Sequence, residues 1–322
     1  MIRNPRGWHV RRGLCRRFVN ANRRIWDLLP SSIKATRTVK RYGAYLHSLV
    51  QRYADRRQFY GTYFLRNRAE IELIRKLAGE LPRGSDLKLT VAGCSNGAEV
   101  YSIVWAIRRS RPDLNLIVEA LEISGEILEV AKGALYGVGS NEFMDGVAIF
   151  ERLTDEEFHE LFEVEHEEVK VKPWIREGIS FRIADAADPS LLNVIGPQHM
   201  VVANRFLCHM TPADAKNCLC NLATLLEPNG YLFVSGVDLD VRTQVARDLG
   251  WIPVPDLMEE IHDGDPSIRR DWPWKWWGLE PFDRSRADWD VRYASTFRVT
   301  GPAKGRVRPE AEQPSEVAIH TG

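Results

Sequence analysis

Short apolar runs alternate with helix-forming stretches along the middle of the chain. The apolar runs predict strands at Lys88–Ala92, Leu116–Leu121, Ser180–Ala184, Met200–Ala203 and Tyr231–Ser235. The stretches beside them predict helices at Ala69–Glu80, Ala98–Ser110, Gly125–Leu135 and Ala213–Leu226. This alternation indicates an α/β fold with a doubly wound, mostly parallel sheet and helices on both faces. Ligands of such sheets bind at the carboxyl ends of the strands.

Three details of this pattern carry further predictions. Pro212 is expected at the start of its helix, where a missing amide costs little. Glu227–Gly230 is expected to end that helix and to turn into the next strand. The segment Gly137–Gly178, between the second and third strands, is too long for a plain connection. We therefore expect it to hold a helix or a small subdomain.

The two ends of the chain differ from the middle in composition. Residues 1–57 are expected to be helical in pieces and contain 15 Lys or Arg but only two acids, although the whole chain has no net charge. A solvated basic arm fits this, and so does a surface for an acidic partner; no nucleic-acid motif is present. Residues 251–290 contain six of the ten tryptophans, which suit either a packed core or lid, or an aromatic ligand platform.

Composition places the chain among globular proteins. It is 44% hydrophobic and 27% charged, and no apolar run approaches the roughly 20 residues that span a bilayer. The basic N-terminus lacks the apolar core of a signal peptide, so we expect a cytoplasmic location. The five cysteines have no paired spacing, which fits reduced thiols. Cys208, His209, Cys218 and Cys220 do not match usual zinc spacings, so we expect no metal.

The run Leu89–Ser102 predicts a buried strand, a tight glycine turn and the start of a helix. Turns of this kind hold phosphates when backbone amides point at the anion. Here a carboxylate, Glu99, lies in the first turn of the helix and would repel a phosphate. It suits a cationic or hydroxyl-bearing ligand, and S-adenosylmethionine has both an ammonium group and ribose hydroxyls. The run also lacks the Gly-x-Gly-x-x-Gly spacing of nicotinamide enzymes.

Residues Phe59–Gly236 resemble the catalytic core of CheR-type S-adenosylmethionine-dependent methyltransferases, which include the chemotaxis receptor glutamate methyltransferases. Thr62–Arg66 resembles the family's Thr-x-Phe-Phe-Arg block, and Ala92–Ser102 resembles its Cys-Ser-x-Gly-Glu-Glu-x-Tyr-Ser loop. Further matching blocks, in the same order, are Leu121–Ser124, Phe181–Asp185 and Glu227–Phe233. The resemblance implies a class I methyltransferase fold over residues 58–300, with an insertion at about 137–178, between the basic segment 1–57 and a tail, 301–322, that we expect to be disordered.

The resemblance also implies a set of cofactor-binding residues. They are Thr62, Arg66, Gly93, Gly97, Glu99, Glu122, Asp185, Ala186, Asn204 and Arg205. Glu99 would pair with the ammonium of S-adenosylmethionine, Glu122 would accept the ribose hydroxyls, and Asp185 would accept from the adenine amino group. The glycines would let the backbone approach the methionine part of the cofactor.

The acceptor side departs from the family pattern. The run Asn204–Thr211 keeps Arg205, but the family's asparagine is replaced by Phe206 and its tyrosine, which lies near the transferred methyl, by Met210. His209 could supply a base instead, so Arg66, Arg205 and His209 are the candidate catalytic residues.

The methyl acceptor therefore stays open at this stage. The resemblance favours a glutamyl carboxylate in a protein, and such an acceptor needs no general base. The altered flanks favour a hydroxyl group of a small molecule or glycan, which would need one. The missing tyrosine also allows a non-catalytic module that only binds S-adenosylmethionine.

Overall fold

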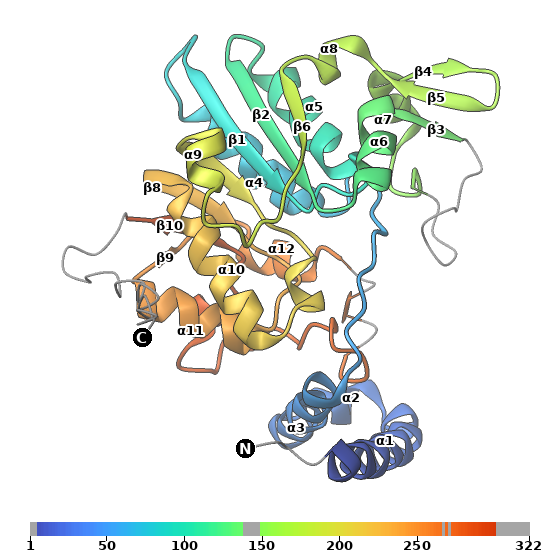
Figure 1. Ribbon diagram of the computed structural model, residues 1–322. Helices are drawn as coiled ribbons and strands as arrows, with labels where there is room; N and C mark the ends of the chain where they lie inside the picture. The colour runs from blue at the N-terminus through green and yellow to red at the C-terminus, as the bar shows by residue number, and fades with distance from the viewer. Residues whose placement is uncertain (1–4, 138–148, 266–267, 270–271, 301–322) are drawn as a thin grey trace, which may run out of the picture.

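The computed structural model describes residues 5–137, 149–265, 268–269 and 272–300. A seven-stranded sheet with the order β6-β2-β1-β7-β8-β10-β9 lies at its centre (Figure 1). The strands are β1 (Asp86–Ala92), β2 (Asn115–Glu122), β6 (Ile179–Ile183), β7 (Gln198–Val202), β8 (Leu226–Phe233), β9 (Ile252–Pro253) and β10 (Thr296–Val299). The first five of these run parallel, and β10 is antiparallel to β8 and β9. The predicted doubly wound, mostly parallel sheet is thus confirmed.

Helices cover both faces of this sheet. Side chains alternate along each strand, so Met200 and Val202 of β7 pack into one core and Val201 into the other. Helices α4 and α5 contribute to the first core, and α10 and α11 to the second. The helices around the sheet are α4 (Arg68–Gly79), α5 (Ala98–Ser110), α6 (Gly125–Gly133), α9 (Leu191–Ile195), α10 (Pro212–Thr224), α11 (Leu239–Leu249), α12 (Met258–Asp263) and α14 (Trp289–Tyr293).

Two predicted helix ends need correction. Helix α6 ends at Gly133 because Ala134 adopts a left-handed conformation, with φ of 53°, and its amide closes the last turn. Helix α10 begins at Pro212 as predicted but ends at Thr224. Glu227–Gly230 lies within β8 rather than between the helix and the strand. The turn-forming residues are accommodated by an irregular register opposite Gln198–Met200.

The long segment between β2 and β6 contains a small sheet of its own. Strands β3 (Leu135–Gly137), β5 (Glu168–Val171) and β4 (Phe162–Glu165) pair antiparallel in that order. Helix α7 (Asp155–Leu161) precedes β4, and helix α8 (Pro173–Arg176) follows β5. Figure 1 shows this small sheet beside α6, at the edge of the domain. Residues 138–148 of the segment, like the predicted tail at 301–322, lie outside the described residues.

The N-terminal helices form a separate bundle below the sheet (Figure 1). They are α1 (Pro5–Leu28), α2 (Ser31–Lys34) and α3 (Arg37–Tyr53), and residues 54–63 connect them to the α/β domain. Trp26 and Leu46 of this bundle pack against Trp272 of the tryptophan-rich segment. The tryptophan-rich segment therefore packs against the N-terminal bundle through Trp272.

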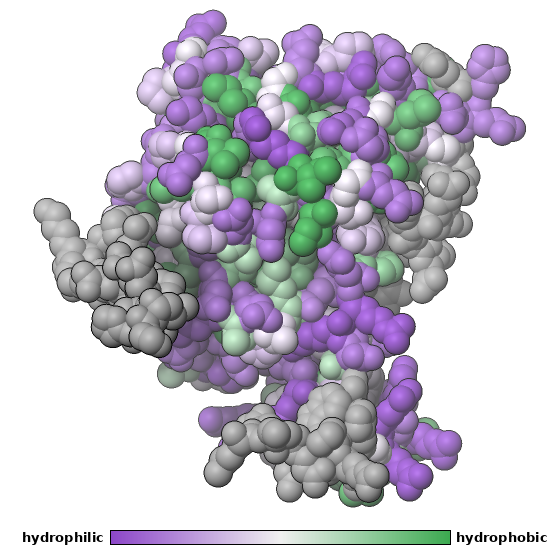
Figure 2. Space-filling model, in the orientation of Figure 1, coloured by the Kyte–Doolittle hydropathy of each residue, from purple (hydrophilic) through white to green (hydrophobic). Residues whose placement is uncertain are grey.

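Figure 2 shows hydrophobic side chains on the surface of the sheet domain. The N-terminal bundle also exposes large hydrophobic side chains, among them Leu14, Ile25 and Leu28. In the part of the chain that the structure describes, no helix is long and apolar enough to cross a membrane.

Candidate functional site

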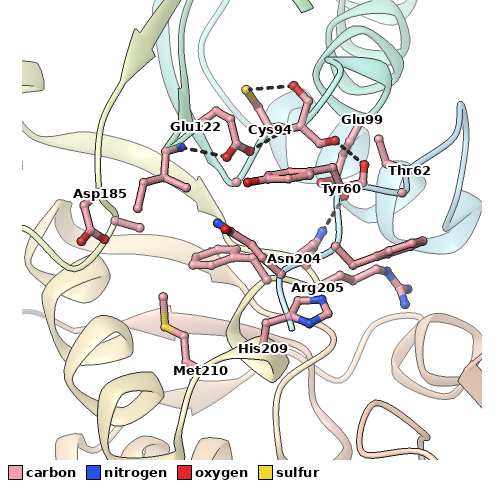
Figure 3. Close-up of a pocket in the computed structure, with 18 of the residues that line it drawn as sticks. Tyr60, Thr62, Cys94, Glu99, Glu122, Asp185, Asn204, Arg205, His209 and Met210 are labelled. Atoms are coloured by element: carbon pink, nitrogen blue, oxygen red, sulfur yellow. Dashed lines mark hydrogen bonds between the residues drawn. The ribbon is translucent and has the colours of Figure 1, made fainter. Parts of the chain in front are cut away.

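A cavity of about 330 Å³ lies where β1, β2, β6 and β7 end (Figure 3). Parallel strands bring their carboxyl ends to one edge of the sheet, so residues far apart in sequence meet there. Its walls come from segment 58–66, the loop after β1, and the ends of β2, β6 and β7. All the predicted site residues except Gly97 line it: Thr62, Arg66, Gly93, Glu99, Glu122, Asp185, Ala186, Asn204, Arg205 and His209.

The glycine loop after β1 contains three left-handed residues, Gly93, Ser95 and Gly97. Gly93 and Gly97 have φ of 69° and 87°, which side-chain-bearing residues rarely adopt. Gly97 differs from the prediction because it packs away from the cavity: a Cβ there would lie 2.9 Å from Tyr101 and 3.2 Å from Ala131. It closes the turn and lets α5 approach α6. Gly93 does line the cavity, beneath the ring of Phe206.

The carboxylate of Glu122 is held by the backbone at the end of β2. One oxygen accepts from the Ser95 amide at 3.0 Å, and the other from the amides of Ile123 at 2.8 Å and Ser124 at 3.1 Å. The side chain is buried and cannot swing away. Because a carboxylate has about four acceptor positions, at least one stays available to a ligand hydroxyl.

Asp185 and Ala186 form the wall next to Glu122. Asp185 is exposed and accepts from the Ala187 amide at 2.9 Å, whereas Ala186 is buried. Figure 3 shows Asp185 and Glu99 on opposite sides of the cavity, with Glu122 between them. The three predicted carboxylates therefore mark out one elongated site.

The side chain of Asn204 links Glu99 to a second carboxylate, Glu70. The Asn204 amide group donates to Glu99 at 2.8 Å and to Glu70 at 2.6 Å. Ser235 fixes this orientation by donating its amide and hydroxyl to the Asn204 oxygen. Burial raises the pKa of Glu99, and burial together with the charge of Glu99 raises the pKa of Glu70 to about 7.

Glu70 was not predicted as a functional residue. Its signal in the sequence is its place on α4, in line with the buried Ile74 and Leu77 on the apolar face of that helix. Its second oxygen, Oε2, is buried and has no hydrogen-bond partner among the described residues. The pair of carboxylates favours a positively charged group at this end of the cavity.

Arg66 and Arg205, whose charges act on Glu99, meet on a carboxylate that the sequence did not reveal. Arg66 Nε and Arg205 Nη1 each lie 2.9 Å from the same oxygen of Asp265, which is 2% exposed. Arg205 has a left-handed backbone, with φ of 64°, and lies tightly against Gly236. Nothing about Asp265 in the sequence, two residues after the similar Asp263, singles it out.

His209 and Met210 complete the wall below the arginines. His209 ends a short 3₁₀ helix, Leu207–His209, and its ring centroid lies 6.4 Å from that of Trp276. Burial lowers the pKa of His209, and a hydrogen bond at the Arg57 backbone offsets this only in part. Arg56 holds the turn by donating to the carbonyls of Cys208 and Met210, both at 2.9 Å. His209 is therefore a fixed, neutral imidazole near neutral pH.

Aromatic residues of the connector and of the β7 turn were also missed. Tyr60 lines the cavity with Phe59 and Phe206, and its carbonyl accepts from the Ser95 hydroxyl. Figure 3 shows the Tyr60 ring lying across the cavity, above Asn204. Thr62, close by, is buried. These side chains can flank a planar or apolar part of a ligand and exclude water from it.

The pattern of the "CheR methyltransferase, SAM binding domain" matches residues 61–244. The chain belongs to the CheR methyltransferase family. The matched domain is an S-adenosylmethionine-binding domain. The residues that line the cavity fit this cofactor, because the carboxylate of Glu99 suits the ammonium group and that of Glu122 suits the ribose hydroxyls. The sheet order is that of the class I fold expected for such enzymes.

Curated relatives of this CheR-type chain are distant. The biofilm formation methyltransferase WspC of Pseudomonas aeruginosa is 27% identical over 213 residues, which is 65% of this chain and 48% of that protein. Chemotaxis protein methyltransferases of Pseudomonas putida and Pseudomonas aeruginosa are 28% and 27% identical over 185 residues, 55% of this chain and 62% of each relative. The chain thus spans about half to three fifths of the length of these relatives.

Proposed function

We propose that this CheR-type chain transfers a methyl group from S-adenosylmethionine to an oxygen atom of an acceptor. The observation that carries the proposal is the placement of Glu99 and Glu122 on the wall of one cavity, with Arg205 and His209 beside it. S-adenosylmethionine supplies an activated methyl group on a sulfonium. Displacement at that methyl needs little more than alignment of the acceptor behind it.

The chain's own residues would divide the work of binding. Glu122 accepts the ribose hydroxyls, and Glu99 with its partner Glu70 holds the ammonium group. Arg66 and Arg205 have further N–H donors besides those that face Asp265, and these can hold the carboxylate of the cofactor. Tyr60 closes over the ligand from the connector and keeps water out.

Two kinds of oxygen acceptor are consistent with this proposal. The names of the relatives, together with the family resemblance, favour a carboxylate on a protein. The position of His209 favours a hydroxyl group, because a hydroxyl must lose its proton and a neutral imidazole can take it. For the basic N-terminal helices, we propose an acidic partner, since the segment contains 15 Lys or Arg against two acids.

The experiment combines binding with methyl transfer. Calorimetry is expected to show S-adenosylmethionine binding to the full chain, and incubation with methyl-labelled cofactor and cell lysate is expected to label an acceptor. Heat-denatured protein gives the blank. Binding without any transfer would replace the enzyme with a non-catalytic binding module, and no binding at all would refute the proposal.

A further inference from the structure

We propose that Asp265 neutralises the two arginines that a carboxylate acceptor would need, so that the acceptor of this enzyme is an uncharged hydroxyl group. The inference rests on the methyl transfer proposed above and names the class of its substrate. It makes Asp265 a specificity-determining residue that lies outside the matched family domain, residues 61–244.

Asp265 contacts both arginines of the cavity. Among the described residues that line the cavity, Arg66 and Arg205 are the cations. A carboxylate acceptor would need such a pair, because guanidinium groups bind carboxylates in a fork geometry. Here one oxygen of Asp265 lies 2.9 Å from both guanidinium groups, and the Tyr63 hydroxyl donates to its other oxygen at 3.3 Å. The arginine pair therefore has an internal carboxylate, and its remaining N–H donors are those proposed above for the carboxylate of the cofactor.

Contacts of the neighbouring residues hold Asp265 against the two arginines. Gly264, just before it, packs so closely on Asn67 that any Cβ there would collide with the Asn67 side chain. Asn67 also donates to the Ile261 carbonyl at 2.9 Å. Arg152 donates to the carbonyls of both Gly264 and Arg66 at 3.2 Å, joining the two segments. These contacts fix the distance between Asp265 and the arginines.

The charged side chains in and behind the cavity wall also disfavour an anionic acceptor. Two arginines, Arg66 and Arg205, line the cavity together with three carboxylates, and the buried Asp265 adds a fourth carboxylate against the arginines. The three that line the cavity are Glu99, Glu122 and Asp185. The net formal charge of these groups is negative, which favours a cofactor with one net positive charge. A second anion, entering as the acceptor, would meet repulsion in a partly water-excluded cavity. A neutral hydroxyl meets no such barrier.

The cavity also contains a side chain, His209, that can remove the proton of a hydroxyl acceptor. The acceptor oxygen forms a bond to the methyl carbon while the bond from that carbon to sulfur breaks, and the sulfonium keeps the electron pair as a neutral thioether. The hydroxyl proton passes to the imidazole of His209, which lines the cavity next to Met210, and then to water. A carboxylate acceptor would leave this base without a task.

The test uses glutarate as a carboxylate probe on the full chain loaded with S-adenosylhomocysteine. The wild-type complex is expected not to bind glutarate measurably, whereas Asp265→Asn frees the arginines and should bind it at least about tenfold more tightly. Asp263→Asn is the matched control, because Asp263 lies on the same segment but pairs with Arg269 away from the cavity. It should behave as wild type.

Glutarate binding to the wild-type complex as tight as to Asp265→Asn would overturn the inference. If Asp265→Asn does not fold, methyl labelling by the wild-type protein still tests the inference. Methyl label that it transfers from S-adenosylmethionine as a base-labile ester on protein would overturn the inference alone, and base-stable label would support it. Failure of S-adenosylmethionine to bind would overturn the proposed function, and the inference with it.

Discussion

At one end of the cavity, Glu122 and Asp185 follow their strands just as the family pattern implies, and backbone amides hold both carboxylates. At the other end, Met210 lies where the sequence resemblance implies a tyrosine, and Asp265 from outside the family domain contacts both Arg66 and Arg205. The first end is the proposed site of a cofactor common to the family, and its side chains follow directly from the strands of the sheet. The second end is the proposed acceptor end, and there the C-terminal segment adds Asp265 to residues of the family domain such as Arg66 and Arg205.

The largest effect is expected from removing the support of the acceptor end. Trp26 is 6% exposed and its ring centroid lies 5.6 Å from that of Trp272. Trp26→Ala should cost about 3 kcal/mol of packing between the N-terminal bundle and the tryptophan-rich segment. Hydrogen exchange in α1 and α3 should accelerate, while S-adenosylmethionine affinity stays unchanged. Ile25→Ala, at a 62% exposed neighbour, is the control. Weakened cofactor binding in Trp26→Ala would mean that the two ends are not independent.

The second effect concerns the proposed base. His209→Gln should lower kcat by about 100-fold with little change in cofactor affinity, because general-base catalysis contributes this much. In the wild type, kcat should fall as the pH drops through the lowered pKa of His209, and this fall should disappear in the variant. His159→Gln on α7 tests for general effects of losing a histidine. An unchanged kcat in His209→Gln would favour a carboxylate acceptor.

The third effect concerns the cofactor end. Glu122→Ala should weaken S-adenosylmethionine binding by about 30-fold, since hydrogen bonds to a charged group are worth about 2 kcal/mol. Calorimetry measures the loss, and circular dichroism shows whether the fold survives. Glu126→Ala, at an exposed position in the following helix, should bind normally. Equal affinities for the two variants would remove the ribose contact from this account.

The smallest effect is a pH dependence of cofactor binding. The pKa of Glu70 is raised to about 7, and its ionised form adds negative charge beside Glu99, near Asn204 and Arg205. The affinity for the cationic cofactor should therefore rise by about fivefold between pH 6 and pH 8, a Coulomb energy of about 1 kcal/mol. Glu70→Gln should flatten this rise. A rise that persists in the variant would assign the titration to another group.

The folded protein should respond to pH in the opposite sense through Glu70. Its carboxyl keeps a proton in the fold up to about pH 7, whereas an unfolded glutamate releases it near 4.5. The unfolded state therefore binds fewer protons over this range, and the contribution of Glu70 to stability falls as the pH rises from about 4.5 to 7.

Much of the sheet could be predicted, because buried parallel strands are continuous apolar runs. The end of α10 could not, since Glu227–Gly230 has the residues of a turn but lies in an irregular part of β8, where pairing with β7 decides the conformation. Propensity at the end of a helix is a weak local signal, and tertiary pairing overrides it.

The residues of the candidate site also divide into those that the local sequence predicts and those that only the tertiary fold brings together. Glu122 and Asp185 could be predicted because they lie at or just after the ends of strands, and Glu99 because it lies in the first turn of the helix that follows β1. Glu70 and Asp265 could not, because their partners are distant in sequence: Glu70 lies 134 residues from Asn204, and Asp265 lies 199 residues from Arg66. Only the fold brings these charges together, and no local pattern records the pairing.

The most direct test of the difference between the two ends is the chemical stability of the transferred methyl group. The full chain, incubated with methyl-labelled S-adenosylmethionine and lysate, should label a small molecule or glycan, and the label should survive mild base. Base-labile label on protein would show a carboxylate acceptor and contradict the account.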